Sequence, residues 1–212
     1  MTDTPTIRNP DLPQYKLIFL GDQNVGKTCI LNRYVNNEFT ENYQATIGLD
    51  FQSKNVTIGN QDLNILFYDT AGQEKFRSLI PLYTRDAKII LLVYDITCKE
   101  SFLHLSDWLQ ELTNVNKEEV IFALVGNKND LKDSRQVTFE EGQKYAEENN
   151  FIFQEISAKE NDGFSELFDN KLFEEIKNKF KPEGQQPKSD RNDIVLNDEE
   201  EDKEKTKKKG CC

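Results

Sequence analysis

The feature that most constrains this chain is a glycine-bounded loop between an apolar run and a helix-like segment. The run at 16–20 has strand character and leads directly into Gly21-Asp22-Gln23-Asn24-Val25-Gly26-Lys27-Thr28, which matches the pattern G-x-x-x-x-G-K-[ST]. The two glycines permit a tight turn in which backbone N–H groups, from about Asn24 to Cys29, point inward. Convergent N–H groups at the start of a helix bind anions, so the sequence predicts a polyphosphate-binding loop.

Two side chains of this loop have predicted roles of their own. Lys27 supplies a full positive charge to the β and γ phosphates. The Thr28 hydroxyl is placed to ligate Mg²⁺, a hard cation that prefers oxygen ligands. The predicted nucleotide contacts of the loop are therefore Asn24, Val25, Gly26, Lys27, Thr28 and Cys29.

Apolar runs that alternate with helix-like segments predict the layers of the fold. Four runs have the length and composition of strands buried on both faces, at 16–20, 88–94, 120–125 and 151–156. Helix-like segments follow or precede them at 26–35, 74–85, 101–113, 138–149 and 163–180, the fourth with a capping box from Thr138 to Glu141. Two more strand-like stretches, 49–58 and 62–69, are joined by the turn dipeptide Gly59-Asn60. We therefore expect an α/β fold with a six-stranded, mostly parallel sheet, one antiparallel edge strand and helices on both faces.

Charge and composition exclude several classes of protein. The chain carries 27 lysine and arginine residues against 38 aspartate and glutamate residues, a formal net charge of −11, which argues against a nucleic-acid partner. No apolar run approaches the roughly 18 residues of a membrane helix, and 1–14 lacks the apolar core of a secretory signal. We expect a flexible N-terminal extension at 1–14, one domain at 15–180 and a disordered tail at 181–212, where prolines and charge runs replace apolar residues.

A second motif, Asp69-Thr70-Ala71-Gly72-Gln73-Glu74, stands at the end of the second hairpin strand. An aspartate at a strand end can hold a metal ion through water, and Gly72 leaves a bare N–H that can reach a γ-phosphate. Gln73 is the candidate for positioning the attacking water. These residues predict the hydrolytic half of the site.

The base is expected to be read where the later strands end. Asn127-Lys128-Asn129-Asp130 follows one strand and Ser157-Ala158-Lys159 follows the next. Guanine presents two donors, N1–H and the 2-amino group, that a single carboxylate such as Asp130 can accept together. The backbone N–H of Ala158 would bond guanine O6, while the Lys128 and Lys159 stems lie along the base faces. Together these motifs favour a guanine nucleotide.

All these residues together resemble the Ras superfamily of small GTPases and, within it, the Rab proteins of vesicle traffic. The resemblance covers about 15–180 plus the last two cysteines. Rab character is indicated by Ile47-Gly48-Leu49-Asp50-Phe51, by Phe76-Arg77-Ser78-Leu79 with Tyr83, by Val93-Tyr94-Asp95-Ile96-Thr97 and by the terminal Cys-Cys. The stretches 43–48 and 76–81 are most similar to the Golgi-associated subgroup conventionally numbered six. The resemblance implies a P-loop NTPase G domain that acts as a monomeric, GTP-hydrolysing switch in vesicle traffic at the Golgi.

The resemblance also implies roles for single residues. Thr46 matches a threonine that ligates Mg²⁺ and contacts the γ-phosphate in the GTP state, Phe39 an aromatic that packs on guanine, and Tyr43 a further GTP contact. Partners are expected to sense the switch through an aromatic triad of Phe51, Tyr68 and Tyr83. This chain departs from the family pattern at Tyr68, where most Rabs have tryptophan, and at Asn24, where a smaller residue is usual.

The last two residues are expected to anchor the protein. Cys211 and Cys212 do not form a C-a-a-X box, and the Rab resemblance implies geranylgeranyl groups on both thiols. Two lipid chains give stable anchoring where one gives only marginal binding. The implied partners are an exchange factor, a GTPase-activating protein, a prenylation escort, a GDP-dissociation inhibitor and effectors. The expected location is the cytoplasmic face of Golgi membranes, with cycling through the cytosol.

Two other classes of protein stay open on the residues alone. A P-loop ATPase or small-molecule kinase would need a second-substrate lid and no guanine reader, and Asp130 argues against it. A module that binds GTP with little or no hydrolysis fits the same motifs, because Asn24 could impair hydrolysis without lowering affinity. The single histidine, His104, is interpreted as a helix-surface or boundary residue, and Cys29 and Cys98 as reduced core thiols.

Overall fold

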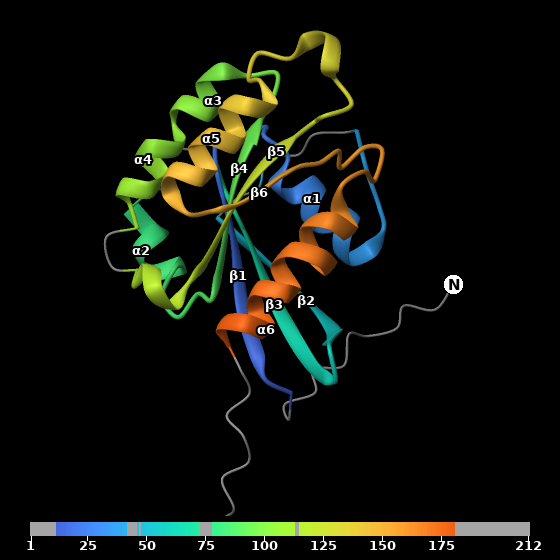
Figure 1. Ribbon diagram of the computed structural model, residues 1–212, viewed down its shortest axis with the longest axis vertical. Coiled ribbons are helices and arrows are strands. Elements are labelled where there is room, and N and C mark those ends of the chain that lie inside the picture. The colour runs from blue at the N-terminus through green and yellow to red at the C-terminus, as the bar shows by residue number, and fades with distance from the viewer. Residues whose placement is uncertain (1–11, 42–45, 47, 73–77, 113–114, 181–212) are drawn as a thin grey trace, which may run out of the picture. The chain divides into compact units, whose positions relative to one another are not determined.

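The fold is a six-stranded sheet between two layers of helices (Figure 1). A computed structural model describes residues 12–41, 46, 48–72, 78–112 and 115–180. The strands lie in the order β2-β3-β1-β4-β5-β6, and only β2 and β3 pair antiparallel. Their bounds are β1 Gln14–Leu20, β2 Leu49–Ile58, β3 Gln61–Thr70, β4 Ile89–Asp95, β5 Ile121–Asn127 and β6 Ile152–Glu155. The expected sheet, with its antiparallel edge strand, is confirmed.

The helices cover both faces, as expected. They are α1 Lys27–Asn36, α2 Ile80–Tyr83, α3 Lys99–Leu103, α4 Leu105–Gln110, α5 Phe139–Asn149 and α6 Phe173–Lys179, with short 3-10 helices at η2 Lys117–Glu119 and η3 Lys132–Ser134, and a π-helical segment at η4 Glu166–Leu172. In Figure 1, α1 and α6 lie on one side of the sheet and α2 to α5 on the other. The predicted capping box at Thr138 and Glu141 opens α5. None of the described helices combines the length and the apolar character that crossing a bilayer requires.

The continuous apolar strands arise because both faces of the sheet are buried. On β1, Leu17 and Phe19 belong to the core beneath α1 and α6, while Ile18 and Leu20 belong to the core beneath α2, α4 and α5. Alternate side chains of a strand point to opposite faces, so a strand covered on both sides must be apolar at every position. Because β1, β4 and β5 pair parallel, their carboxyl ends meet at one edge of the sheet.

The helix expected over 101–113 is interrupted, because α3 and α4 meet at His104. The Ser106 hydroxyl donates to the Leu103 carbonyl at 3.1 Å, and the Asp107 amide donates instead to the His104 carbonyl at 3.0 Å. A side-chain hydroxyl that takes a backbone acceptor weakens the helical ladder at that point.

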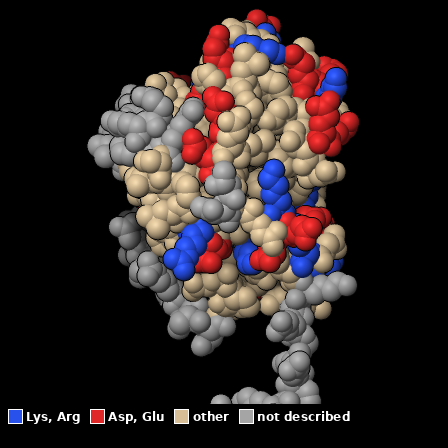
Figure 2. Space-filling model, turned by 90° about the vertical axis from the view of Figure 1, so that its left-hand side faces the viewer, with Lys and Arg blue, Asp and Glu red and all other residues tan. Residues whose placement is uncertain are grey.

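The described residues all belong to the first of two units, Met1–Lys181 and Pro182–Cys212. Residues 1–11 and 181–212 lie outside the described residues, so the flexible extension and the disordered tail stay predictions. Figure 2 looks onto the face formed by the left-hand helices of Figure 1, where acidic side chains gather toward the top and basic ones lie scattered among them.

One buried hydroxyl in the second core provides a test of this packing. Tyr94 is fully buried on β4, and among the described residues its hydroxyl oxygen has no hydrogen-bond partner. An unsatisfied buried polar atom costs about 1–3 kcal/mol, and burial raises the pKa of Tyr94 accordingly. We expect Tyr94→Phe to raise the melting temperature by about 2–4 °C for each kcal/mol recovered. The control is Tyr145→Phe, a half-buried ring on the same Phe102, which should change little; an unchanged or lower melting temperature for Tyr94→Phe would contradict the expectation.

Candidate nucleotide-binding site

The predicted phosphate loop joins β1 to α1, and its shape requires glycine at both ends. Gly21 has φ +141°, and a Cβ there would lie 2.1 Å from the Val93 carbonyl oxygen of β4. Gly26 has φ +95°, and a Cβ would lie 2.3 Å from the Asn127 amide nitrogen. Asn24 adopts φ 64°, a left-handed conformation that asparagine tolerates better than most residues. The family departure at Asn24 is thus compatible with the backbone of this loop.

Lys27 is the buried cation of the loop. Its side chain is 5% exposed, and its ammonium donates to the carbonyls of Gly21 at 2.8 Å and Asp22 at 2.7 Å. Burial lowers the pKa of Lys27 to about 8, although the carboxylates of Asp69 and Asp22 act in the opposite direction. A desolvated ammonium interacts strongly with an anion, because little water screens the charge.

Three oxygen-bearing side chains converge beside this lysine. The Thr28 hydroxyl contacts the Thr46 hydroxyl at 2.8 Å and donates to Asp69 Oδ2 at 2.5 Å, while Thr46 donates to the same oxygen at 3.3 Å. The other oxygen, Asp69 Oδ1, is buried without a partner among the described residues. Burial raises the pKa of Asp69, against the effect of both hydroxyls and of Lys27. Two hydroxyls and an orphaned carboxylate oxygen form a set of hard oxygen donors that fits Mg²⁺.

Gly72 follows this cluster and packs against the phosphate loop. A Cβ on Gly72 would lie 2.4 Å from the Asp22 carbonyl carbon and the Gln23 amide nitrogen. The backbone of the second motif therefore approaches the loop as closely as only glycine allows. Gln73 and Tyr43 lie outside the described residues, and their roles stay predictions.

The base-reading residues form one connected network. The Asn127 amide donates to the Val25 carbonyl at 2.8 Å, and its carbonyl oxygen accepts from the Ala158 N–H at 3.3 Å. The Ser157 hydroxyl donates to Asp130 Oδ1 at 2.6 Å, which orients that carboxylate. The Asn127 side chain therefore connects the phosphate loop to the loop after β6 through two hydrogen bonds.

The phosphate and base ends open into one pocket of about 740 Å³. Its lining includes these predicted residues: Asn24, Gly26, Lys27, Thr28, Cys29, Phe39, Thr46, Gly72, Asn127, Lys128, Asp130, Ala158 and Lys159. Val25 and Ser157 lie buried beneath the lining, where they act through the hydrogen bonds given above. Cys29 and Cys98 are free thiols but only half-buried; Cys29 packs against the edge of the first core and lines the pocket.

A model of the Ras family matches residues 16–178. The chain belongs to the Ras family. Ras-family proteins are in general small GTPases that bind GTP and GDP with Mg²⁺, and they interact with exchange factors, activating proteins and effectors. The pocket described above lies within the matched residues and contains most of the residues that the sequence predicts for phosphate, metal and base contacts.

Sequence reasoning missed several residues of this Ras-family site. The lining also contains Gln23, Asn32, Glu38, Thr40, Glu41, Thr70 and Leu131. Asp95, at the end of β4, pairs with Lys128 at 2.5 Å and so fixes the lysine of the base motif. Most of the missed lining residues stand within a few positions of a recognised motif, which is the only signal the sequence offers for them.

His104 is exposed and stands at the boundary between α3 and α4, as interpreted from the sequence, but it also has a long-range contact. Its Nδ1 lies 2.6 Å from Asp22 Oδ2, and Trp108 Nε1 donates to Asp22 Oδ1 at 2.8 Å. The contact was not foreseen because Asp22 stands 82 positions away in the chain, beyond the reach of a local pattern. The break between α3 and α4 thus contacts the phosphate loop.

The predicted effector residues of the Ras-family fold are only partly brought together. Phe51 on β2 and Tyr68 on β3 are register partners, and their rings meet edge to face at 5.2 Å. Lys16 lies over the Tyr68 ring at 4.5 Å. Tyr83 stands half-buried on α2, next to Leu82, whose side chain is 64% exposed. The aromatic pair is a feature of the structure, while its role in partner binding stays a prediction.

Proposed function

We propose that this Ras-family protein is a Rab-type switch that hydrolyses GTP to GDP and phosphate and regulates vesicle traffic at the Golgi. The carrying observation is the single pocket in which buried Lys27, the oxygens around Asp69 and the carboxylate of Asp130 face one ligand space. A buried ammonium, a cluster of hard oxygens and a carboxylate suit a polyphosphate, a hard cation and guanine respectively. The Rab assignment rests on the sequence motifs at 47–51, 76–79 and 93–97.

The proposed reaction is in-line attack of water on the γ-phosphorus. A bond forms from the water oxygen to phosphorus, the bond to the β–γ bridging oxygen breaks, and GDP and inorganic phosphate leave. Lys27 and the loop N–H groups hold the phosphate oxygens, and Gln73 orients the water. Thr28, Thr46 and Asp69 would hold Mg²⁺, which would supply neutralisation of charge on the phosphates when bound.

The switching element follows from the same contacts. Thr46 bonds to Thr28 and Asp69 through its hydroxyl, and Gly72 packs on the Asp22–Gln23 peptide. Both segments can therefore sense whether a third phosphate is present. When that phosphate leaves, the two loops lose a shared anchor, and partners that bind the Phe51–Tyr68 surface can distinguish the two states.

Gln73→Leu tests the hydrolytic half of the proposal. Leucine cannot orient water, so we expect single-turnover release of phosphate to slow by about a hundredfold, the cost of losing a positioned reactant. Gln61→Leu makes the same change at the start of β3, outside the pocket lining, and should release phosphate at the wild-type rate. A wild-type rate in Gln73→Leu would refute its role. Tight GTP binding without any release by the wild-type protein would favour the module that binds GTP without hydrolysis.

The membrane half of the proposal rests on Cys211 and Cys212, together with a prenylation escort and a GDP-dissociation inhibitor as partners. We expect the protein isolated from its cells to carry two isoprenoid groups by mass spectrometry. A fluorescent fusion should lie on Golgi membranes, and changing both cysteines to serine should release it to the cytosol, because two chains are what make anchoring stable. Unmodified thiols, or a serine variant that stays on membranes, would contradict this anchoring.

A further inference from the structure

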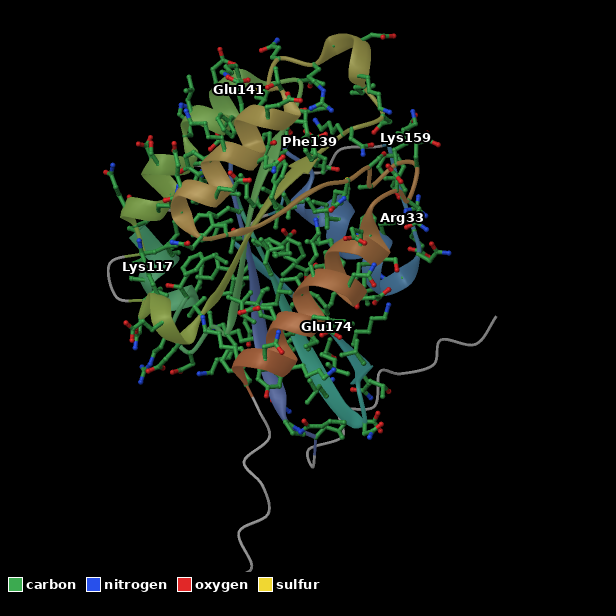
Figure 3. All side chains as sticks on the ribbon, in the orientation of Figure 1. Arg33, Lys117, Phe139, Glu141, Lys159 and Glu174 are labelled. Carbon is green, nitrogen blue, oxygen red and sulfur yellow. The ribbon has the colours of Figure 1, made fainter. Side chains whose placement is uncertain are left out.

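The last turn of α1 carries an arginine that the nucleotide motifs do not include. Arg33 Nε donates to the Ala158 carbonyl at 2.9 Å, and Nη2 donates to the Lys159 carbonyl at 3.1 Å. Figure 3 shows Arg33 and Lys159 on the same side of the molecule. The Ala158 N–H is expected to reach guanine O6 while it also donates to Asn127 Oδ1, a long hydrogen bond of 3.3 Å that one N–H can share between two acceptors. The guanidinium thus holds the loop after β6 by two successive carbonyls, a match for its rigid planar fork.

The same guanidinium also holds the segment that leaves α1. Arg33 Nη1 donates to the Asn37 carbonyl at 3.1 Å, where the backbone turns left-handed at φ 56°. The guanidinium carbon stands 5.9 Å from the centre of the Phe39 ring, within cation–π range. Phe39 lines the pocket. Arg33 therefore contacts both walls of the base end of the pocket, which are the loop at 158–159 and the segment at 37–41.

A second contact joins the same two walls at the surface. Lys159 Nζ pairs with Glu41 at 3.0 Å, and both residues line the pocket. The Glu41 carboxylate holds the pKa of Lys159 above its usual value. Exposed ion pairs contribute little by themselves, so the half-buried fork of Arg33 is the main link between the walls.

We propose that Arg33 is a positioning residue for guanine recognition, which holds the loop at 158–159 against the segment at 37–41. The inference rests on the proposed function and assigns this residue to retention of the base. GDP and GTP share their base, so loss of Arg33 weakens the binding of both nucleotides by the same factor. Adenine lacks the 6-oxo acceptor and gains nothing from the Ala158 N–H, so ADP is affected less.

Affinity measurements on the full-length protein test this role. Nucleotide-free Arg33→Ala is titrated with a fluorescent GDP analogue, and GDP, ADP and a non-hydrolysable GTP analogue compete. Losing two hydrogen bonds from a charged donor should weaken GDP and the GTP analogue by about tenfold each, so the GDP to ADP affinity ratio also falls. Arg33→Lys should show most of the same loss of affinity, because an ammonium lacks the planar guanidinium that bonds two carbonyls at once. Arg85→Ala, an exposed arginine outside the pocket lining, is the matched control and should bind as wild type does.

Three outcomes would overturn the inference. They are wild-type GDP affinity in Arg33→Ala, an equal loss for ADP and GDP, and a loss for GDP that the GTP analogue does not share. If Arg33→Ala does not fold, Arg33→Lys carries the test, and a wild-type GDP affinity in that variant would overturn it. A wild-type protein that binds no guanine nucleotide at all would instead overturn the proposed function.

Discussion

Asp130→Asn is expected to weaken GTP binding by about a hundredfold to a thousandfold, the loss of two hydrogen bonds to a charged acceptor. Asp130 lines the base end of the pocket, and Ser157 fixes one of its oxygens at 2.6 Å. The NH₂ of an asparagine amide places a hydrogen-bond donor against the guanine 2-amino group, which is also a donor. The same amide can donate to the 2-oxo group of xanthine, so we expect xanthosine triphosphate to bind the variant better than it binds the wild-type protein.

The gain for xanthosine triphosphate makes this prediction independent of folding, because a damaged protein does not improve its binding of a new ligand. The matched control is Asn129→Ala at the neighbouring position, whose side chain bonds Asp162 at 3.0 Å and does not line the pocket. Equilibrium titration with each triphosphate measures both affinities. If Asp130→Asn binds GTP as tightly as wild type, the guanine assignment is wrong, and an ATPase or kinase again becomes the better interpretation.

Lys27→Met is expected to weaken the binding of GDP and GTP by about a thousandfold, because the contact between a desolvated charge and the phosphates is lost. Methionine keeps the apolar length of the side chain, so the space beside α1 stays filled. Lys27 is 5% exposed and its ammonium bonds the carbonyls of Gly21 and Asp22, so the variant also tests whether the loop keeps its shape without that group.

Lys16→Met is the matched control for Lys27→Met. Lys16 is a partly buried lysine on β1, outside the pocket lining, and its ammonium bonds the Arg85 carbonyl. It should bind GTP as wild type does. Circular dichroism of the nucleotide-free Lys27→Met protein checks that it remains folded. A folded Lys27→Met that binds GTP tightly would contradict the role of this lysine.

The sheet and the phosphate loop were predictable because local patterns determine them. Strands buried on both faces are recognisable as continuous apolar runs, and the hairpin β2–β3 is marked by its turn dipeptide Gly59-Asn60. The phosphate loop could be recognised from its two glycines. They are needed there because a Cβ at either position would clash with a neighbouring strand or side chain.

The braces of the site were not predictable, because they join residues far apart in the chain. Arg33 contacts a residue 125 positions away, and His104 contacts Asp22 across 82 positions. Neither residue stands in a motif, and an arginine or histidine on a helix is ordinary in sequence. The break between α3 and α4 was missed for a similar reason, since a serine within a helix-like segment shows no sign of bonding the preceding turn.

The nucleotide that the purified protein carries, and its fate, tests the central claim most directly. Bound nucleotide is released by denaturation and identified by ion-exchange chromatography, and loaded GTP is then followed over hours with Mg²⁺. A Ras-family switch should carry GDP and convert GTP to GDP slowly, because among the described residues no arginine lines the pocket, and an activating protein is expected to supply one. Adenine nucleotide in the preparation, or guanine nucleotide that is never converted even with an activating protein, would contradict the account.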